Sequence, residues 1–265
     1  MAVYTDVVRH RELFANLFRR NFQAKYRGSV LGIVWSLVTP LALMGVYLVV
    51  FGLLWRGNTI PYYPLYLLAG IACWVFFSTS IQAASRALVD SADLVKKVRF
   101  PRQLVALSVV ATQLVTFGAM LVIVIALSVA FVPRARPYVL LSIPLSLLFV
   151  CLVAGVALVV ASLNVLFRDV EHILDTALLP WFFLTPILWS FSELPESVHE
   201  NQRLLELLEW GNFVGPPIAA IRDALWSGGP PSAADTIYLA VAAAVSLAIG
   251  AAVFSRIDDR IAIEL

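Results

Sequence analysis

Long stretches without Asp, Glu, Lys or Arg alternate along the chain with short segments that carry most of the charge. A helix needs roughly 17 to 25 mostly apolar residues to cross the hydrocarbon core of a bilayer. Six stretches approach or exceed that length, and the fifth is short and holds Pro180 and Pro186. The pattern predicts an all-α membrane protein with six transmembrane helices, at about residues 33–55, 62–85, 103–132, 138–166, 170–191 and 235–255.

The composition agrees with a membrane protein. Hydrophobic residues make up 61% of the 265 residues, and charged residues make up only 14%. So few charged residues cannot cover the surface of a water-soluble globule, so lipid is the expected solvent for most of the chain. The formal net charge of +2 argues against a nucleic-acid-binding protein.

The basic residues are distributed unevenly between the two ends of the predicted spans. Cytoplasmic segments of membrane proteins carry an excess of Lys and Arg. With six spans, most of the 19 Lys and Arg residues fall on the side that holds both termini. The opposite side holds Arg56, Arg134, Arg136, Arg203 and Arg222. We therefore predict a multi-pass protein with both termini in the cytoplasm.

Residues 1–32 are predicted to form a cytoplasmic amphipathic helix and a lead-in to the membrane domain, which comprises residues 33–265. From Asp6 to Gln23, apolar and polar side chains take opposite faces at helical spacing. Such a helix lies in the membrane interface, either as an anchor near anionic headgroups or as a lever that touches a cytoplasmic partner. The side chains selected for this interface helix are Arg11, Glu12, Phe14, Phe18 and Arg19.

A second cytoplasmic segment, Arg86 to Arg102, is predicted to contain a short helix that begins near Ser91. Its apolar side chains share one face, and its basic side chains take the others. Pro101 suits the first turn of the next span. The segment is either a solvated loop that follows the positive-inside rule or a docking element that inserts its apolar face into a groove on a partner.

The longest segment on the opposite side, Glu193 to Asp235, is predicted to form two short external helices before the last span. Leucines and glutamates take opposite faces of the first helix, and Ile218 to Trp226 forms the second. A Gly-Pro break from Gly211 to Pro217 separates them. The pair forms either a lid over a pathway or a packed external hairpin.

The sequence lacks the motifs of nucleotide and metal chemistry. Its only lysines are Lys25, Lys96 and Lys97, and none follows a glycine, so the chain has no P-loop for ATP. The three histidines have no metal-ligand spacing, and we expect no catalytic residue and no metal site. Because the six stretches are free of charge, no ionisable group is expected in mid-span. The energy for transport would then come from outside the chain.

Four segments resemble one family of transport proteins. Residues 25–40 (KYRGSVLGIVWSLVTP) are similar to the amino-terminal signature of type-2 ABC exporter permeases for O-antigen, teichoic acid and polyol phosphate polymers. Residues 94–102 (LVKKVRFPR) resemble the first cytoplasmic coupling loop of that family, and residues 164–169 (NVLFRD) resemble the segment that enters its fifth span. Asn212 to Asp223 is similar to its external stretch, although Phe213 stands where a proline commonly follows the asparagine. The resemblance covers nearly the whole chain.

The resemblance implies a permease that is not itself an enzyme. Two copies of the chain would assemble with two cytoplasmic ATPase subunits in the bacterial cytoplasmic (inner) membrane and export lipid-linked polysaccharide. ATP and Mg would be bound by the partner ATPase, with no cofactor in this chain. The coupling helix seated on the ATPase would comprise Asp90, Asp93, Leu94, Val95, Lys96, Lys97, Val98, Arg99 and Phe100.

The first and fifth spans line the pore in proteins of this family. Aromatic faces stack on sugars without demanding one sequence of them. The resemblance thus nominates as pore-lining residues Tyr47, Phe51, Trp55, Trp181, Phe182 and Trp189. Each of these side chains could instead face lipid or the membrane interface.

Three other functions stay open on the sequence. A type-2 ABC exporter of a small drug or lipid would share the fold and the partner. A membrane-embedded glycosyl-lipid enzyme would need clustered Asp, Glu or His near one membrane face. A structural subunit without transport would leave the coupling-loop pattern unexplained. The candidates for an enzymatic cluster are Asp90 with Asp93, and Arg168 with Asp169 and Glu171.

Overall fold

The computed structural model describes residues 2–28, 32, 34–50, 60–97, 100–194 and 201–264. These residues form helices and no strand, as the sequence predicted. The α-helices are α1 (Ala2–Arg9), α2 (Arg11–Tyr26), α3 (Val34–Tyr47), α4 (Tyr63–Asp90), α5 (Ala92–Lys97), α6 (Gln103–Phe131), α7 (Ser142–Leu166), α8 (Asp169–Leu184), α10 (Gln202–Trp210), α11 (Gly215–Trp226) and α12 (Ala233–Glu264). Short 3₁₀ turns are η2 (Pro133–Ala135), η3 (Val139–Leu141) and η4 (Phe191–Glu193).

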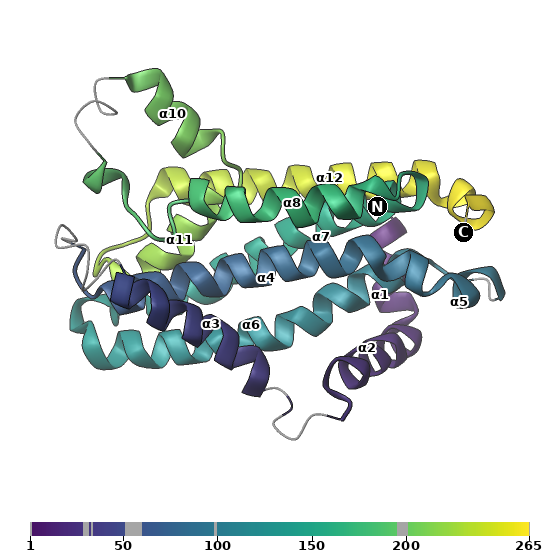
Figure 1. Ribbon diagram of the computed structural model, residues 1–265, viewed down its shortest axis with the longest axis horizontal. Helices are drawn as coiled ribbons and strands as arrows, with labels where there is room; N and C mark the ends of the chain where they lie inside the picture. Colours follow the sequence, from purple (N-terminus) through teal and green to yellow (C-terminus); the bar gives the residue numbers. More distant parts are fainter. Residues whose placement is uncertain are drawn as a thin grey trace.

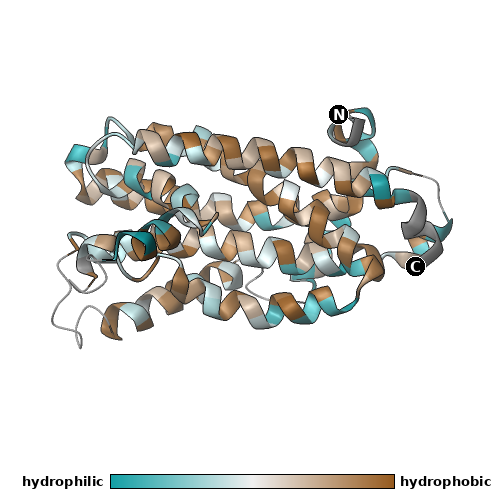
Figure 2. Ribbon diagram, turned by 90° about the horizontal axis from the view of Figure 1, so that it is seen from above, coloured by the Kyte–Doolittle hydropathy of each residue, from teal (hydrophilic) through white to brown (hydrophobic). Residues whose placement is uncertain are grey.

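The long helices run side by side along the longest axis of the molecule, and α4 packs against most of the others (Figure 1). In α4, 78% of the most apolar stretch is buried, against 28% in α6 and 22% in α12. The helices α6 and α12 therefore turn apolar side chains outward, which suits lipid as their surroundings. Figure 2 shows hydrophobic residues along the length of the bundle and hydrophilic residues mainly toward its ends.

In the described part of the chain, four helices are long and apolar enough to cross a membrane. They are Tyr63–Asp90, Gln103–Phe131, Val139–Leu166 and Ala233–Asp258. The chain is therefore a multi-pass membrane protein, as predicted. The other two predicted spans are represented by shorter helices, the apolar helix Val34–Val50 that includes α3, and α8.

The predicted fifth span, residues 170–191, is longer than the helix that forms. α8 ends at Leu184, and Thr185 adopts an extended backbone with ψ of 134°. Thr185 precedes Pro186, and a proline ring disfavours helical backbone in the residue before it. The chain after α8 instead folds toward α4, where the Tyr63 hydroxyl donates to Leu188 O at 2.8 Å.

The N-terminal segment forms two helices where one was predicted. α1 and α2 are separated at His10, whose backbone (φ −112°, ψ 38°) is not helical. The Tyr4 hydroxyl of α1 donates to Leu247 O of α12 at 2.7 Å. Gln103 Nε2 of α6 donates to Asp6 Oδ2 of α1 at 2.7 Å. The break thus lets α1 form hydrogen bonds with α6 and α12, while α2 runs in a different direction.

α2 lies along the first half of α6. Leu17 is 4% exposed, and Asn21 Nδ2 donates to Ser108 Oγ at 2.9 Å. After α2 the chain passes Gly28 and Gly32, whose φ angles of 77° and 49° lie in the left-handed region that glycine tolerates. These glycines let the chain turn from the amphipathic helix into α3.

The end of the bundle away from the termini carries two short helices, α10 and α11. α10 projects from the bundle (Figure 1), and none of its residues is buried. α11 begins earlier than predicted because Pro216 and Pro217 occupy its first turn instead of the preceding break. It packs against α4, α7 and α12. The two helices therefore have different surroundings: α10 faces outward and α11 belongs to the core.

α7 and α12 approach each other closely at Gly155 and Gly250. Ser246 Oγ of α12 donates to Leu152 O of α7 at 2.7 Å. A Cβ atom at Gly250 would lie 2.6 Å from Gly155 O, and a Cβ atom at Gly155 would overlap Ser246. Small residues let the two backbones meet without a side chain between them, as in other membrane helix pairs.

Gly155→Ala is expected to push α7 and α12 apart and to lower the free energy of unfolding by about 1–3 kcal/mol, the usual cost of overpacking. The measurement is thermal unfolding of the purified protein in detergent. Gly118→Ala on α6 is the control, because a Cβ atom there meets nothing within 4 Å. Equal melting temperatures for the two variants would contradict the close contact.

Candidate functional site

α5 lies at the end of the bundle that also holds both termini (Figure 1), and half of its six residues are charged. Val95 is 3% exposed and packs in a buried cluster with Leu88 of α4. Asp93, Lys96 and Lys97 are exposed, and Lys97 Nζ lies 3.8 Å from Asp93 Oδ1. α5 therefore turns Val95 toward its own bundle and presents mainly charged groups outward.

The other coupling candidates differ in their exposure. Asp90 is exposed, whereas Leu94 and Phe100 are partly buried against the same cluster as Val95. Val98 and Arg99 lie outside the described residues. A partner that meets α5 would contact charged side chains with Leu94 at their edge. The described part of α5 does not offer a wholly apolar docking face, because Val95 is buried against other helices of the same chain.

The side chains selected for the interface helix lie on α2 and differ in their exposure. Arg11, Glu12 and Arg19 are exposed, and Phe14 and Phe18 are partly buried. One side of α2 thus packs toward α6, and the other side offers charged groups to the surroundings.

An ion-pair cluster that the sequence did not predict joins α4 to α8. Arg86 Nε lies 2.8 Å from Glu171 Oε1, and Arg86 Nη2 lies 3.0 Å from Asp175 Oδ2. Gln82 Nε2 donates to Asp175 Oδ1 at 3.0 Å. These side chains are partly exposed, so each pair stabilises the fold by about 0–1 kcal/mol at most. Glu171, a candidate for the rival enzyme, is here bonded to a neighbouring helix.

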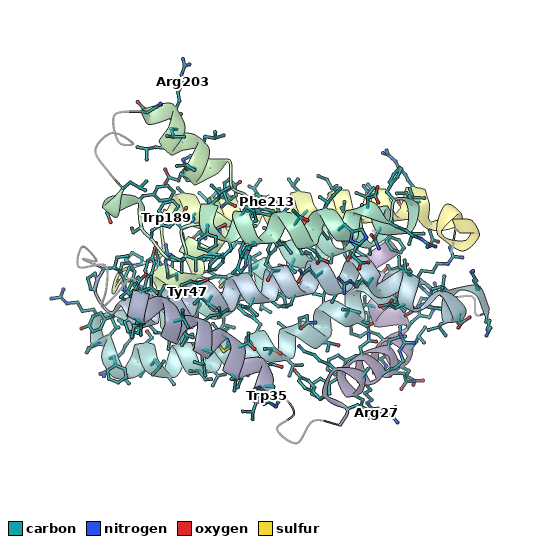
Figure 3. All side chains as sticks on the ribbon, viewed as in Figure 1. Arg27, Trp35, Tyr47, Trp189, Arg203 and Phe213 are labelled. Atoms are coloured by element: carbon teal, nitrogen blue, oxygen red, sulfur yellow. The ribbon has the colours of Figure 1, made fainter. Side chains whose placement is uncertain are left out.

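Four of the six pore candidates are described, and two of them pack in an aromatic cluster with α4. Tyr47 of α3 stacks on Phe182 of α8, with 5.7 Å between ring centroids. Trp74 of α4 lies 5.7 Å from Phe182 and 6.1 Å from Trp181, centroid to centroid. Figure 3 shows Tyr47 and Trp189 toward the end of the bundle away from the termini. The two candidates outside the described residues are Phe51 and Trp55.

Hydrogen bonds hold the indole rings of α8 and the segment after it. Trp181 Nε1 donates to Asn212 Oδ1 at 2.9 Å, and Asn212 Nδ2 donates to Thr185 Oγ1 at 2.9 Å. Trp189 Nε1 donates to Phe183 O at 3.0 Å. Asn212 thereby links the segment before α11 to the end of α8. The sequence marks Asn212 only as part of a family motif, because its partners Trp181 and Thr185 lie far away along the chain.

Buried and exposed side chains of α8 follow the helical repeat and therefore lie on different faces of the helix. Leu178 and Phe182 are each 6% exposed, whereas Leu179 and Phe183 are 65% and 49% exposed. Residues four positions apart share a face of a helix. Phe182, a predicted pore-lining residue, therefore lies on the buried face of α8, and its neighbour Phe183 lies on the exposed face. The exposed large hydrophobic side chains of α3 are Val34, Trp35, Val38, Leu43 and Val46.

Residues 12–201 match the description of ABC-2 type transporters. The chain belongs to the ABC-2 type transporter family. It is a transmembrane permease, the transport subunit of an ABC transporter, which confirms the family that the sequence motifs suggested.

Relatives of this ABC-2 permease carry a common name. The chain is 35% identical over 202 residues to the O-antigen export system permease protein RfbA of Myxococcus xanthus, and the match covers 76% of each chain. Two proteins of the same name from Klebsiella pneumoniae are 30% identical over 187 residues and 28% identical over 186 residues. Each of these matches covers 70% of this chain and 71% of the relative.

Phe182→Ala in the ABC-2 permease is expected to lower the free energy of unfolding by about 3–5 kcal/mol, the range for truncating a buried Phe. Phe183→Ala removes the same atoms from an exposed face and should cost about 0.5 kcal/mol or less. Thermal unfolding in one detergent compares the two variants. Equal losses would contradict the burial of Phe182 against α4.

Proposed function

We propose that this permease moves lipid-linked polysaccharide across the membrane as part of an ATP-driven exporter. The observation that carries the proposal is the similarity to the O-antigen export permease of Myxococcus xanthus, at 35% identity over 76% of both chains. The motifs at residues 25–40 and 94–102 resemble the same class of exporter and support it independently of that one relative.

The energy source in this proposal is a separate protein. The sequence has no P-loop, so ATP and Mg are bound by two cytoplasmic ATPase subunits, and this chain holds no cofactor. The permease docks on them through α5, with Asp93, Lys96 and Lys97 facing the partner. The exposed Arg19 of α2 extends the same charged surface. Charged contacts of this kind set the orientation of partners and make docking sensitive to salt.

The proposed location is the bacterial inner membrane, with both termini in the cytoplasm. The excess of Lys and Arg on the side of the termini supports this orientation. The helix Val34–Val50 and α8 complete six crossings. At 1.5 Å per residue each is about 25 Å long, somewhat less than the hydrocarbon core of about 30 Å. Local thinning of the bilayer and oligomerisation both accommodate a short span.

The permease works as a dimer in this proposal, and the exposed apolar faces of α3 and α8 meet across its axis. Tyr47, Trp181 and Trp189 lie beside the polymer pathway and stack on sugar rings, together with Phe51 and Trp55. Phe182 contributes by supporting the ring of Tyr47, since only 6% of Phe182 is exposed.

Lys96→Glu combined with Lys97→Glu is expected to reduce ATP hydrolysis by the co-expressed permease and ATPase at least about tenfold, because the reversed charges oppose docking. Leu94→Asp, at the edge of the same surface, should act in the same direction. The measurements are co-purification of the two proteins and ATPase activity of the complex.

Arg203→Glu is the matched control for charge reversal, because Arg203 stands on α10 at the far end and points away from the bundle (Figure 3). Its complex should form and hydrolyse ATP as the wild type does. Docking by α5 would be excluded if the α5 variants kept full activity, or if Arg203→Glu lost as much as they do.

Cells that lack this chain are expected to lose polysaccharide from their surface and to accumulate the lipid-linked form inside, because the polymer is made but not exported. Surface staining and gel analysis of extracted lipid-linked material measure both quantities. Complementation with the wild-type chain should restore the surface polymer, and the double Lys→Glu variant should not. An unchanged surface polymer together with altered efflux of a drug or lipid would instead support the small-substrate exporter.

A further inference from the structure

A polar cavity of about 690 Å³ lies between α2, α4 and α6. Arg20 and Lys25 line it from α2, and Arg86 and Asp90 line it from α4. The rest of the wall mixes hydroxyl and amide groups, among them Gln113 of α6, with the apolar side chains Ala24, Ala83, Ala87 and Val109. The cavity is large enough for a charged headgroup, and nothing in the functional proposal above uses it.

The two basic side chains of α2 in this cavity have neutral partners. Lys25 Nζ donates to Gln113 Oε1 at 2.6 Å and to Thr116 Oγ1 at 3.3 Å, and Arg20 Nη2 donates to Ser91 Oγ at 3.1 Å. The ion pairs among the described residues include neither Arg20 nor Lys25. Arg86, in contrast, is already bonded to two carboxylates of α8. Arg20 and Lys25 are therefore exposed cations in the cavity wall, and neither forms an ion pair with a described carboxylate, although Asp90 lies in the same wall.

Lys25 belongs to α2, outside the predicted spans, and its ammonium group contacts the side of α6. Gln113 stands ten residues after the first residue of α6, about 15 Å along a helix of 29 residues. The charge-free stretch of α6 is thus approached by an ammonium group that α2 supplies. Basic side chains next to the membrane-spanning part of a protein attract anionic lipid headgroups.

A second cavity of about 260 Å³ adjoins the first, and the two share Lys25, Thr79 and Gln113 in their walls. The second cavity lies between α3, α4 and α6, and part of its wall is apolar, with Val75 and Phe117. The larger cavity thus has basic groups in its wall, and the smaller cavity next to it has a more apolar wall. A lipid has the same order of groups, an anionic head followed by an apolar chain.

We propose that the larger cavity binds the phosphate or diphosphate headgroup of a membrane lipid. Arg20 and Lys25 meet the charge of the anion, and the apolar chain of the lipid begins in the smaller cavity. Two lipids share this chemistry: an anionic phospholipid of the bilayer and the polyprenyl diphosphate that would carry the exported polymer. Assigning the site to the carrier rests on the proposed function, whereas assigning it to an anionic lipid does not.

The test is binding of defined lipids to the intact permease, co-purified with its ATPase in a neutral detergent and measured by native mass spectrometry. The probes are a polyprenyl diphosphate, phosphatidylglycerol, phosphatidylcholine and inorganic diphosphate. The wild type should bind the two anionic lipids more tightly than phosphatidylcholine. Arg20→Gln and Lys25→Gln should each weaken that binding about fivefold, the effect of removing one basic group near an anionic lipid surface.

Two variants keep the result interpretable. Arg27→Gln removes one positive charge from the end of the same helix, outside the cavity wall, and should leave the affinities unchanged. Lys25→Arg preserves the charge inside the cavity and should retain most of the affinity, with a melting temperature equal to that of the wild type. Loss in Lys25→Gln but not in Lys25→Arg therefore supports a charge-dependent site and excludes misfolding.

The site is overturned if Arg20→Gln and Lys25→Gln bind the anionic lipids as tightly as the wild type, or if phosphatidylcholine or inorganic diphosphate binds equally well. Tighter binding of the polyprenyl diphosphate than of phosphatidylglycerol assigns the site to the carrier, and the reverse order assigns it to a bilayer phospholipid. Because binding is measured without transport, it can fail while surface polymer is still exported. That result would remove this site and leave the proposed function in place.

Discussion

The hydrocarbon core of a bilayer contains no water to bond peptide groups, so every backbone N–H and C=O inside it must find a partner within the protein. Helices meet this requirement locally, and the described residues accordingly contain helices and no strand. The same constraint acts on hydroxyl groups. Ser162 Oγ and Thr112 Oγ1 donate to carbonyl oxygens four residues earlier in their own helices, at 2.7 and 3.0 Å. Groups that can recognise a partner or a ligand are therefore concentrated at the ends of the bundle and around α2.

α8 makes contacts near both ends of the bundle. Its first turns hold Glu171 and Asp175, which bond to Arg86 near the docking end. Its last turns hold Trp181 and Phe182, which pack on Trp74 and belong to the aromatic cluster. A shift of α8 relative to α4 would disturb both sets of contacts together. This makes α8 the physical link between the ATPase-facing surface and the aromatic pathway in the proposed exporter.

The candidate sites were predictable to different degrees. The positions of the coupling segment and of the interface helix follow from local charge and helical spacing, which is why Lys96 and Lys97 were expected outside the bundle and are exposed. Asn212 and Lys25 acquire their roles from partners far away in the sequence, at Trp181 and at Gln113. A local pattern contains no information about such partners. Phe182 is an intermediate case. Its aromatic side chain is evident from the sequence, but its burial depends on packing against α4.

The sequence by itself determined that the chain is a helical membrane protein of the ABC-2 type, since apolar stretch lengths, the distribution of Lys and Arg, and short motifs are local properties. Only the tertiary structure decided that His10 separates α1 from α2, that Val95 of α5 packs inward, and that Lys25 lies beside α6. These features arise from packing between segments that are distant in the chain. Their geometry exists only once the helices are assembled.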